Sequence, residues 1–113
     1  MRESLRDMIF VYGLINPVTH EVKYVGRTSA LRARYREHCR GASRSTKAWV
    51  STLPSDPLLV VLETVRADGD GSTLQLRAND CETKWLKRFR RTVINQRLRD
   101  NSPQAWDALV NRV

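Results

Sequence analysis

The chain has 113 residues, 41% of them hydrophobic, with a formal net charge of +8 and an isoelectric point near 10.3. This length and hydrophobic content are typical of a single compact domain and exclude an intrinsically disordered chain. No apolar run is long enough to cross a bilayer, so we expect a soluble, cytoplasmic protein with one domain spanning residues 1–113 and its core at about 8–97.

The positive charge is concentrated in two segments. Residues 27–47 carry seven Lys and Arg side chains against one acid, Glu37, and residues 84–99 carry seven more and no acid. If both segments converge on one surface, they form the footprint expected for a polyanion such as DNA. Neither reads as an isolated amphipathic helix, which argues against a membrane partner. The alternative is a basic protein whose charges are merely well solvated.

Cys39 and Cys81 are the only cysteines, and neither has histidine or cysteine neighbours at zinc-ligand spacing. We interpret both as small core or half-buried thiols in a reducing compartment. A disulfide between them is the open alternative.

The hydrophobic pattern predicts three strands. Residues 8–15 are almost continuously apolar, as expected of a central strand, and residues 21–27 return as its hairpin partner after a turn over 16–20. With Val18 at the loop centre, Tyr12 pairs directly with Tyr24, and both phenols share one face. Residues 58–65 form the third strand, because they are rich in β-branched and apolar side chains.

Helices are predicted between and after these strands. Thr28 or Ser29 can cap a helix that begins near Ala30 and ends before Gly41. A short helix follows over residues 46–53, a long one over 72–91, and a terminal one over 102–113. The expected fold is α/β (α+β), a small three-stranded antiparallel sheet flanked by helices. Each of the first three predicted helices is expected to point one set of side chains toward the core. In chain order, the sets are Leu31, Arg34, Tyr35 and His38; Trp49, Val50 and Leu53; and Leu74, Ala78, Cys81, Trp85 and Phe89.

Side chains suited to phosphate chemistry are concentrated over residues 24–38, YVGRTSALRARYREH. An arginine stands ten residues after Tyr24, and a histidine follows one helical turn later. Two further polar residues lie on or after the long predicted helix. The ordered set is Phe10-Val11-Tyr12, Tyr24-Val25-Gly26, Arg27, Arg34, His38, Glu82 and Asn95. This set, spanning residues 8–97, resembles the GIY-YIG nuclease family, although the first signature keeps only its tyrosine.

The resemblance implies a DNA endonuclease dependent on Mg²⁺ or Mn²⁺. Water would attack the phosphodiester and leave a 5′-phosphate and a 3′-hydroxyl, with one strand cut per active site. Since the sequence shows no DNA-recognition module beside this domain, we also expect limited sequence specificity. No small-molecule cofactor is implied, and the oligomeric state is left open. The implied catalytic residues are Tyr12, Tyr24, Arg34, His38, Glu82 and Asn95, with substrate contacts from Gly26, Arg27 and Arg32.

The chemistry of these side chains supports the same expectation. Tyr12 or Tyr24 can accept the proton of the attacking water, provided that neighbouring cations lower the phenol pKa. Arg34 presents a planar fork to two phosphate oxygens, and His38 can move a proton or hold a phosphate. Glu82 is the only acid within the apolar stripe of its helix, so it is the expected ligand of a mostly hydrated metal ion.

Other interpretations stay open. Each residue alone has an ordinary structural explanation: a core aromatic for either tyrosine, an ion pair of Glu82 with Lys87 or Arg88, and a turn or cap role for Asn95. The competing function is a nucleic-acid-binding module that kept the fold and lost catalysis. A third is an RNA-binding arginine-rich helix over residues 31–44. We expect the tryptophans to be core residues rather than base-stacking platforms: Trp49, Trp85 and Trp106.

Overall fold

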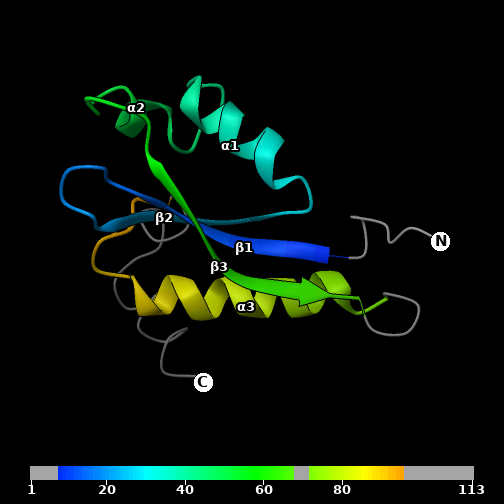
Figure 1. Cartoon of the computed structure of the whole chain (residues 1–113). Helices are drawn as coiled ribbons and strands as arrows, with labels where there is room; N and C mark the ends of the chain where they lie inside the picture. The colour runs from blue at the N-terminus through cyan, green and yellow to red at the C-terminus, as the bar shows by residue number, and fades with distance from the viewer. Residues whose placement is uncertain (1–7, 68–71, 96–113) are drawn as a thin grey trace.

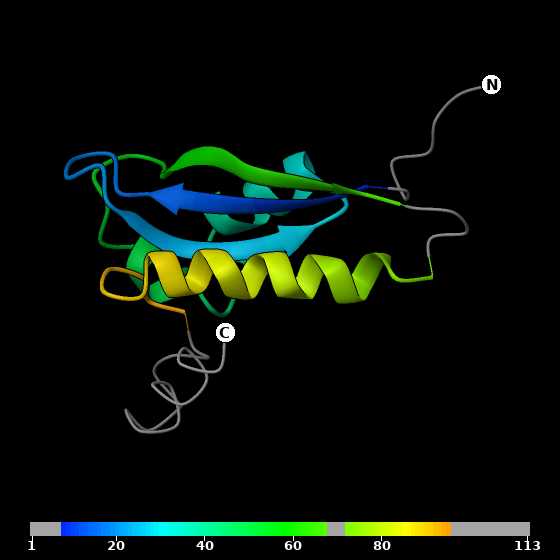
Figure 2. The same cartoon turned by 90° about the horizontal axis from the view of Figure 1, so that it is seen from below.

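The computed structural model describes residues 8–67 and 72–95. Strand β1 (Met8–Ile15) lies between β2 (Val22–Thr28) and β3 (Leu58–Arg66) in an antiparallel sheet of order β2-β1-β3. Helix α3 (Leu74–Arg88) lies along one face of this sheet, and α1 (Leu31–Cys39) and α2 (Lys47–Val50) lie on the other (Figure 1, Figure 2). The predicted α+β fold with a three-stranded antiparallel sheet and a central first strand is confirmed.

The register of the hairpin differs from the prediction. Tyr12 pairs with Gly26, and Leu14 pairs with Tyr24, so the direct pairing of the two tyrosines is wrong by two residues. The cause lies in the turn, where the Asn16 side chain accepts the Val18 and Thr19 amides at 2.8 and 3.1 Å and shifts the loop centre toward Thr19. Because the shift is two residues, the two phenols still share one face, as predicted.

The face under α3 holds the larger apolar core. Strand residues that alternate with the tyrosines point to this face, and the buried residues of α3 meet them at helical spacing. Leu86 is fully buried here, although it was not among the side chains expected to point inward. Cys81, Trp85 and Phe89 are only half-buried around this core. The buried set is Ile9, Val11, Val25, Val65, Leu74, Ala78 and Leu86.

A second cluster fills the face under α1 and α2. It is built on Tyr12, Leu14 and Tyr24, with half-buried apolar side chains from both helices packed around them. Three of these, Leu31, Tyr35 and Trp49, come from positions expected to point inward. The tyrosines are therefore core residues as well as candidates for function, because aromatic rings bury large apolar areas while the hydroxyl keeps a polar partner.

Helix boundaries are shorter than predicted. The helix expected over 46–53 is regular only over Lys47–Val50, and the one expected over 72–91 only over Leu74–Arg88. Ala30, not Thr28 or Ser29, is the N-cap residue of α1, and the Thr28 hydroxyl accepts the Ala30 amide at 3.0 Å. Gly41 ends this segment with a positive φ of 74°, as its glycine suggested.

Both cysteines are free thiols, so the disulfide alternative is wrong. The predicted terminal helix over 102–113, including Trp106, lies outside the described residues. None of the helices within residues 8–67 and 72–95 has the length and apolar character needed to span a bilayer.

Candidate active site

A chain of three buried polar side chains lies at the centre of the α1 face. The Tyr12 hydroxyl lies 2.7 Å from Nε2 of His38, and Nδ1 of the same ring lies 2.6 Å from the Thr46 hydroxyl. All three residues are at most 1% exposed. Tyr12 comes from β1, His38 from the last turn of α1, and Thr46 from the loop before α2. These two hydrogen bonds therefore connect the sheet to α1 and to the loop that leads into α2.

The surroundings of these three hydrogen-bonded side chains keep the His38 imidazole neutral. Burial, followed by the positive charge of Arg34, lowers the pKa of His38 from 6.5 to about 4. A neutral imidazole has one donor and one acceptor nitrogen, and each nitrogen here has a hydroxyl partner. If Nδ1–H donates to Thr46, then Nε2 accepts the proton of Tyr12, and the phenol oxygen keeps its lone pairs for another donor.

The depressed pKa of His38 makes folding stability depend on pH. Because the folded-state pKa lies below the unfolded value, the unfolded chain binds more protons in this window, and stability falls as the pH falls from 6.5 toward 4. We expect His38 to remove about 2 kcal/mol from the free energy of unfolding between pH 7.5 and pH 5. Urea unfolding at several pH values measures this change in the free energy of unfolding. A His38→Gln variant is expected to lose less over the same range; equal losses in both proteins would contradict this account.

Tyr24 extends the cluster toward the surface. Its ring centroid lies 5.1 Å from that of His38 and 6.2 Å from that of Tyr12, and its hydroxyl accepts a hydrogen bond from Ser45 at 3.3 Å. It is 9% exposed, more than either partner ring. Of the two tyrosines, Tyr24 is thus the one closer to solvent.

Gly26 lies directly beside both phenols. A Cβ atom at this position would lie 2.7 Å from the Tyr12 hydroxyl oxygen and 2.9 Å from Cε2 of Tyr24. No side chain larger than hydrogen fits here without moving one of the rings. The glycine therefore brings the backbone of β2, an edge strand of the sheet, close to the Tyr12 hydroxyl.

The guanidinium of Arg34 lies near the Tyr12 hydroxyl. Its Nη1 donates to Glu37 at 2.7 Å and its Nη2 donates to Ser43 at 3.2 Å. Burial and the nearby Tyr24 raise the pKa of Tyr12, while Arg34 opposes the rise. Burial therefore outweighs the guanidinium, and Arg34 alone does not acidify the Tyr12 phenol. Tyr12 is a protonated hydroxyl at neutral pH.

Glu82 lies on the opposite face of β2 from the tyrosines. Alternation along the strand points Arg27 toward α3, where its Nε lies 3.7 Å from Oε1 of Glu82. The alternative pairing of Glu82 with Lys87 or Arg88 is not the one observed. The carboxylate is 14% exposed, and its charge raises the pKa of Tyr12, so the two groups interact across the edge of the sheet.

The donor set around Glu82 suits only a loosely held cation. Within the part of the chain that the structure describes, no group of three or more His, Cys, Asp and Glu side chains could enclose a metal ion. A single carboxylate fits Mg²⁺ or Mn²⁺, which keep most of their water and complete their shell with substrate oxygens. It does not fit a closed zinc site.

Asn95 acts on the backbone of β2 rather than on a tyrosine hydroxyl. Its Oδ1 accepts the Val25 amide at 3.0 Å, and its Nδ2 donates to the Val25 carbonyl at 2.7 Å. The side chain is buried and thereby imitates a neighbouring strand. Asn95 is a positioning residue that fixes the stretch between Tyr24 and Gly26.

The structure brings Tyr12, Tyr24, Gly26, Arg34 and His38 together on one face of the sheet, whereas Glu82 and Arg27 lie on the other face. Arg32 is exposed on α1 and lies two positions, or roughly 200°, from Arg34 around the helix, so it does not face the tyrosines. Sequence reasoning missed the loop residues that bind the site side chains: Ser43, Ser45 and Thr46. The only signal was the hydroxyl-rich run SRSTK directly after the helix break.

Comparison with known proteins gives no relative: neither a family model, nor a curated protein, nor a solved structure matches this chain. The likeness to GIY-YIG nucleases stays a prediction that rests on the residues and their arrangement.

Proposed function

We propose that this protein is a divalent-metal-dependent endonuclease that hydrolyses one DNA strand at a time. The observation that carries the proposal is the meeting of Tyr12, Tyr24, His38 and Arg34 on one face of edge strand β2, with Glu82 and Arg27 on the other. A phosphodiester bound beside Gly26 and Arg27, past the part of the β2 edge that residues 92–95 cover, would have both groups around it. Each face thus brings one arginine, paired with a glutamate, close to the backbone of β2.

The proton path follows from the hydrogen bonds on the α1 face. A water attacks phosphorus and gives its proton to the Tyr12 oxygen, while the original phenol proton moves to Nε2 of His38. Thr46 holds Nδ1 so that Nε2 is the basic nitrogen. The bond to the 3′ oxygen breaks, and this oxygen takes a proton from solvent. Because the pKa of His38 is low, the imidazolium readily gives its proton up and returns to the neutral form.

The charged residues bind and orient the phosphate. Arg34 is oriented by Glu37 and Ser43, and its guanidinium can stabilise the negative charge of the pentacoordinate transition state. Arg27 supplies a second cation from the other face of β2. Glu82 would hold the metal ion, which when bound polarises the phosphate and stabilises the departing alkoxide.

A binding module without catalysis is the second candidate, and one observation favours it. Tyr12 is only 1% exposed and its pKa is raised, which are the properties of a core tyrosine. In that case the same basic surface binds DNA, and the buried hydroxyl chain only stabilises the fold.

Nicking of supercoiled plasmid distinguishes the two candidates. We expect the purified chain to convert supercoiled DNA to open circles in Mg²⁺ and to stop when EDTA removes the metal, with DNA binding retained. The products should carry 5′-phosphates, which a ligase seals directly. DNA binding without any nicking, in either Mg²⁺ or Mn²⁺, would establish the binding module instead.

A further inference from the structure

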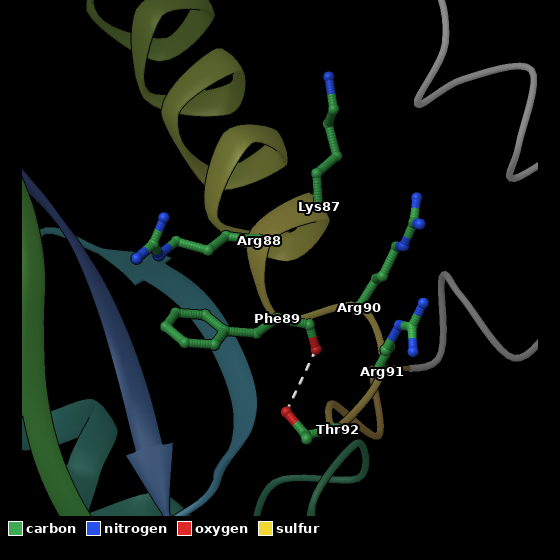
Figure 3. Close-up of a pocket in the computed structure, with 6 residues that line it drawn as sticks. All are labelled: Lys87, Arg88, Phe89, Arg90, Arg91 and Thr92. Carbon is green, nitrogen blue, oxygen red and sulfur yellow. Dashed lines mark hydrogen bonds between the residues drawn. The ribbon is translucent and has the colours of Figure 1, made fainter.

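A basic groove lies at the carboxyl-terminal end of α3, outside the site described above. Two adjoining pockets, of about 610 and 350 Å³, share Lys87 and Arg88 as lining residues. The smaller continues over Phe89, Arg90, Arg91 and Thr92 (Figure 3). In Figure 3, Lys87, Arg90 and Arg91 extend away from the helix end, while Arg88 extends toward the strands. We call Lys87, Arg88, Arg90 and Arg91 the α3 basic rim.

The charges of this rim are not neutralised by the rest of the described chain. Within residues 8–67 and 72–95, the ion pairs involve Lys23, Arg27, Arg34 and Lys84, and none involves a rim residue. Lys84, which also lines the larger pocket, is paired with Glu63 at 2.6 Å. Lys87, Arg90 and Arg91, which all extend away from the helix end, repel one another without an acid partner, so they favour an anion in the groove (Figure 3).

The rim is held by the core rather than displayed on a loose tail. Phe89 stacks on Trp85 with ring centroids 6.0 Å apart, and it packs against the main core. The Thr92 hydroxyl donates to the Val22 carbonyl at 2.6 Å and lies 3.2 Å from the Phe89 carbonyl. These contacts fix the backbone on both sides of Arg90 and Arg91.

The same contacts join the groove to the candidate active site. After Thr92 binds Val22, the Ile94 amide donates to the Lys23 carbonyl at 2.7 Å, and Asn95 binds both backbone groups of Val25. Val22 and Tyr24 are two residues apart on one strand, or about 7 Å.

Helix-end cations have an ordinary explanation that covers only part of the rim. Lys87 and Arg88 lie in the last turn of α3, where they offset the negative end of the helix dipole. Arg90 and Arg91 lie beyond the C-cap residue Phe89 and are exposed. Their guanidiniums, which present planar forks to phosphate oxygens, are not needed to complete the helix.

We propose that the α3 basic rim binds the sugar–phosphate backbone of the DNA strand that continues from the bond being cut. This proposal rests on the proposed function for the identification of the ligand as DNA. The rim would supply affinity and direction along the strand, and Arg34 and Arg27 would contact the phosphate at the reaction centre. Since backbone contacts read no bases, the groove adds binding without sequence specificity.

Salt-dependent DNA binding tests the proposal without requiring catalysis. Fluorescence anisotropy in EDTA would compare the wild type with Arg90→Ala, Arg91→Ala and the double variant, on single-stranded and duplex DNA. Each lost phosphate contact is expected to reduce the slope of log K against log salt by about one, so the double variant loses about two. Arg66→Ala, an exposed arginine at the end of β3, is the matched control and should keep the wild-type slope.

The outcomes separate this inference from the proposed function. An unchanged slope in the double variant, with circular dichroism showing it folded, overturns the groove proposal whether or not the wild type nicks plasmid. Reduced slopes on DNA support the rim as a DNA-binding surface even if nicking is never observed, in which case only the part of the proposal that concerns the cut strand fails. An RNA strand of the same sequence that binds more tightly, with the same dependence on Arg90 and Arg91, would overturn the assignment to DNA.

Discussion

A Glu82→Gln variant is expected to bind DNA as the wild type does and to nick plasmid more than about a hundredfold more slowly. Glutamine keeps the shape of the side chain at this half-buried position but removes the negative charge. Without it, the candidate metal ion loses its one protein ligand, and Arg27 loses its ionic partner. Plasmid nicking in a Mg²⁺ titration measures the first effect, and anisotropy in EDTA measures the binding.

Asp80→Asn provides the matched control. It removes one negative charge from the same helix, two residues away, but its side chain is exposed. We expect it to nick at the wild-type rate. If Glu82→Gln and Asp80→Asn behave alike, the carboxylate has no special part in the reaction. Partial recovery of Glu82→Gln at high Mn²⁺ would support a weakened metal site rather than a misfolded protein.

Replacing Tyr12 by Phe is expected to have the second large effect. The ring stays in the core, while the hydroxyl that links the attacking water to His38 is lost. General acid–base catalysis contributes roughly 10²–10⁴-fold, and we expect the nicking rate to fall within that range. The variant also leaves Nε2 of a fully buried imidazole without its partner, at a cost of about 1–3 kcal/mol in unfolding free energy.

Tyr35→Phe distinguishes catalysis from stability in this experiment. The Tyr35 hydroxyl donates to the Pro57 carbonyl at 2.7 Å, and its ring packs against the same aromatic cluster. Its loss therefore removes a comparable hydrogen bond without touching His38. We expect a modest loss of stability and wild-type nicking. A Tyr12→Phe variant that cuts as fast as Tyr35→Phe would exclude the Tyr12 proton path.

The fold could be predicted because its signals are local. The continuous apolar run of β1, the β-branched residues of β3 and the turn residues after Ile15 each specify their own element. The period-two rule then placed both tyrosines on one face, even though the pairing was displaced. The displacement itself depends on how the Asn16 side chain folds the turn, which the pattern of hydrophobic residues does not encode.

The site was only partly predictable, for a similar reason. Residues with unusual chemistry in their context, such as Glu82 in an apolar helix stripe, were identifiable from the sequence. Thr46 was not, because a hydroxyl in a polar loop becomes significant only when folding buries it 2.6 Å from an imidazole. The raised pKa of Tyr12 was missed too, since it depends on the burial of the ring rather than on its neighbours in the sequence.

The pairing of Asn95 with Val25 has a consequence for how copies of this protein can associate. Edge strands are the usual route to aggregation, because their unpaired amides and carbonyls recruit strands from other chains. On β2, residues 92–95 already bind the carbonyls of Val22 and Lys23 and both backbone groups of Val25. The polypeptide therefore covers this part of its sheet border, residues 22–25, with its own downstream segment, which makes it a poor place for a strand of another copy to pair.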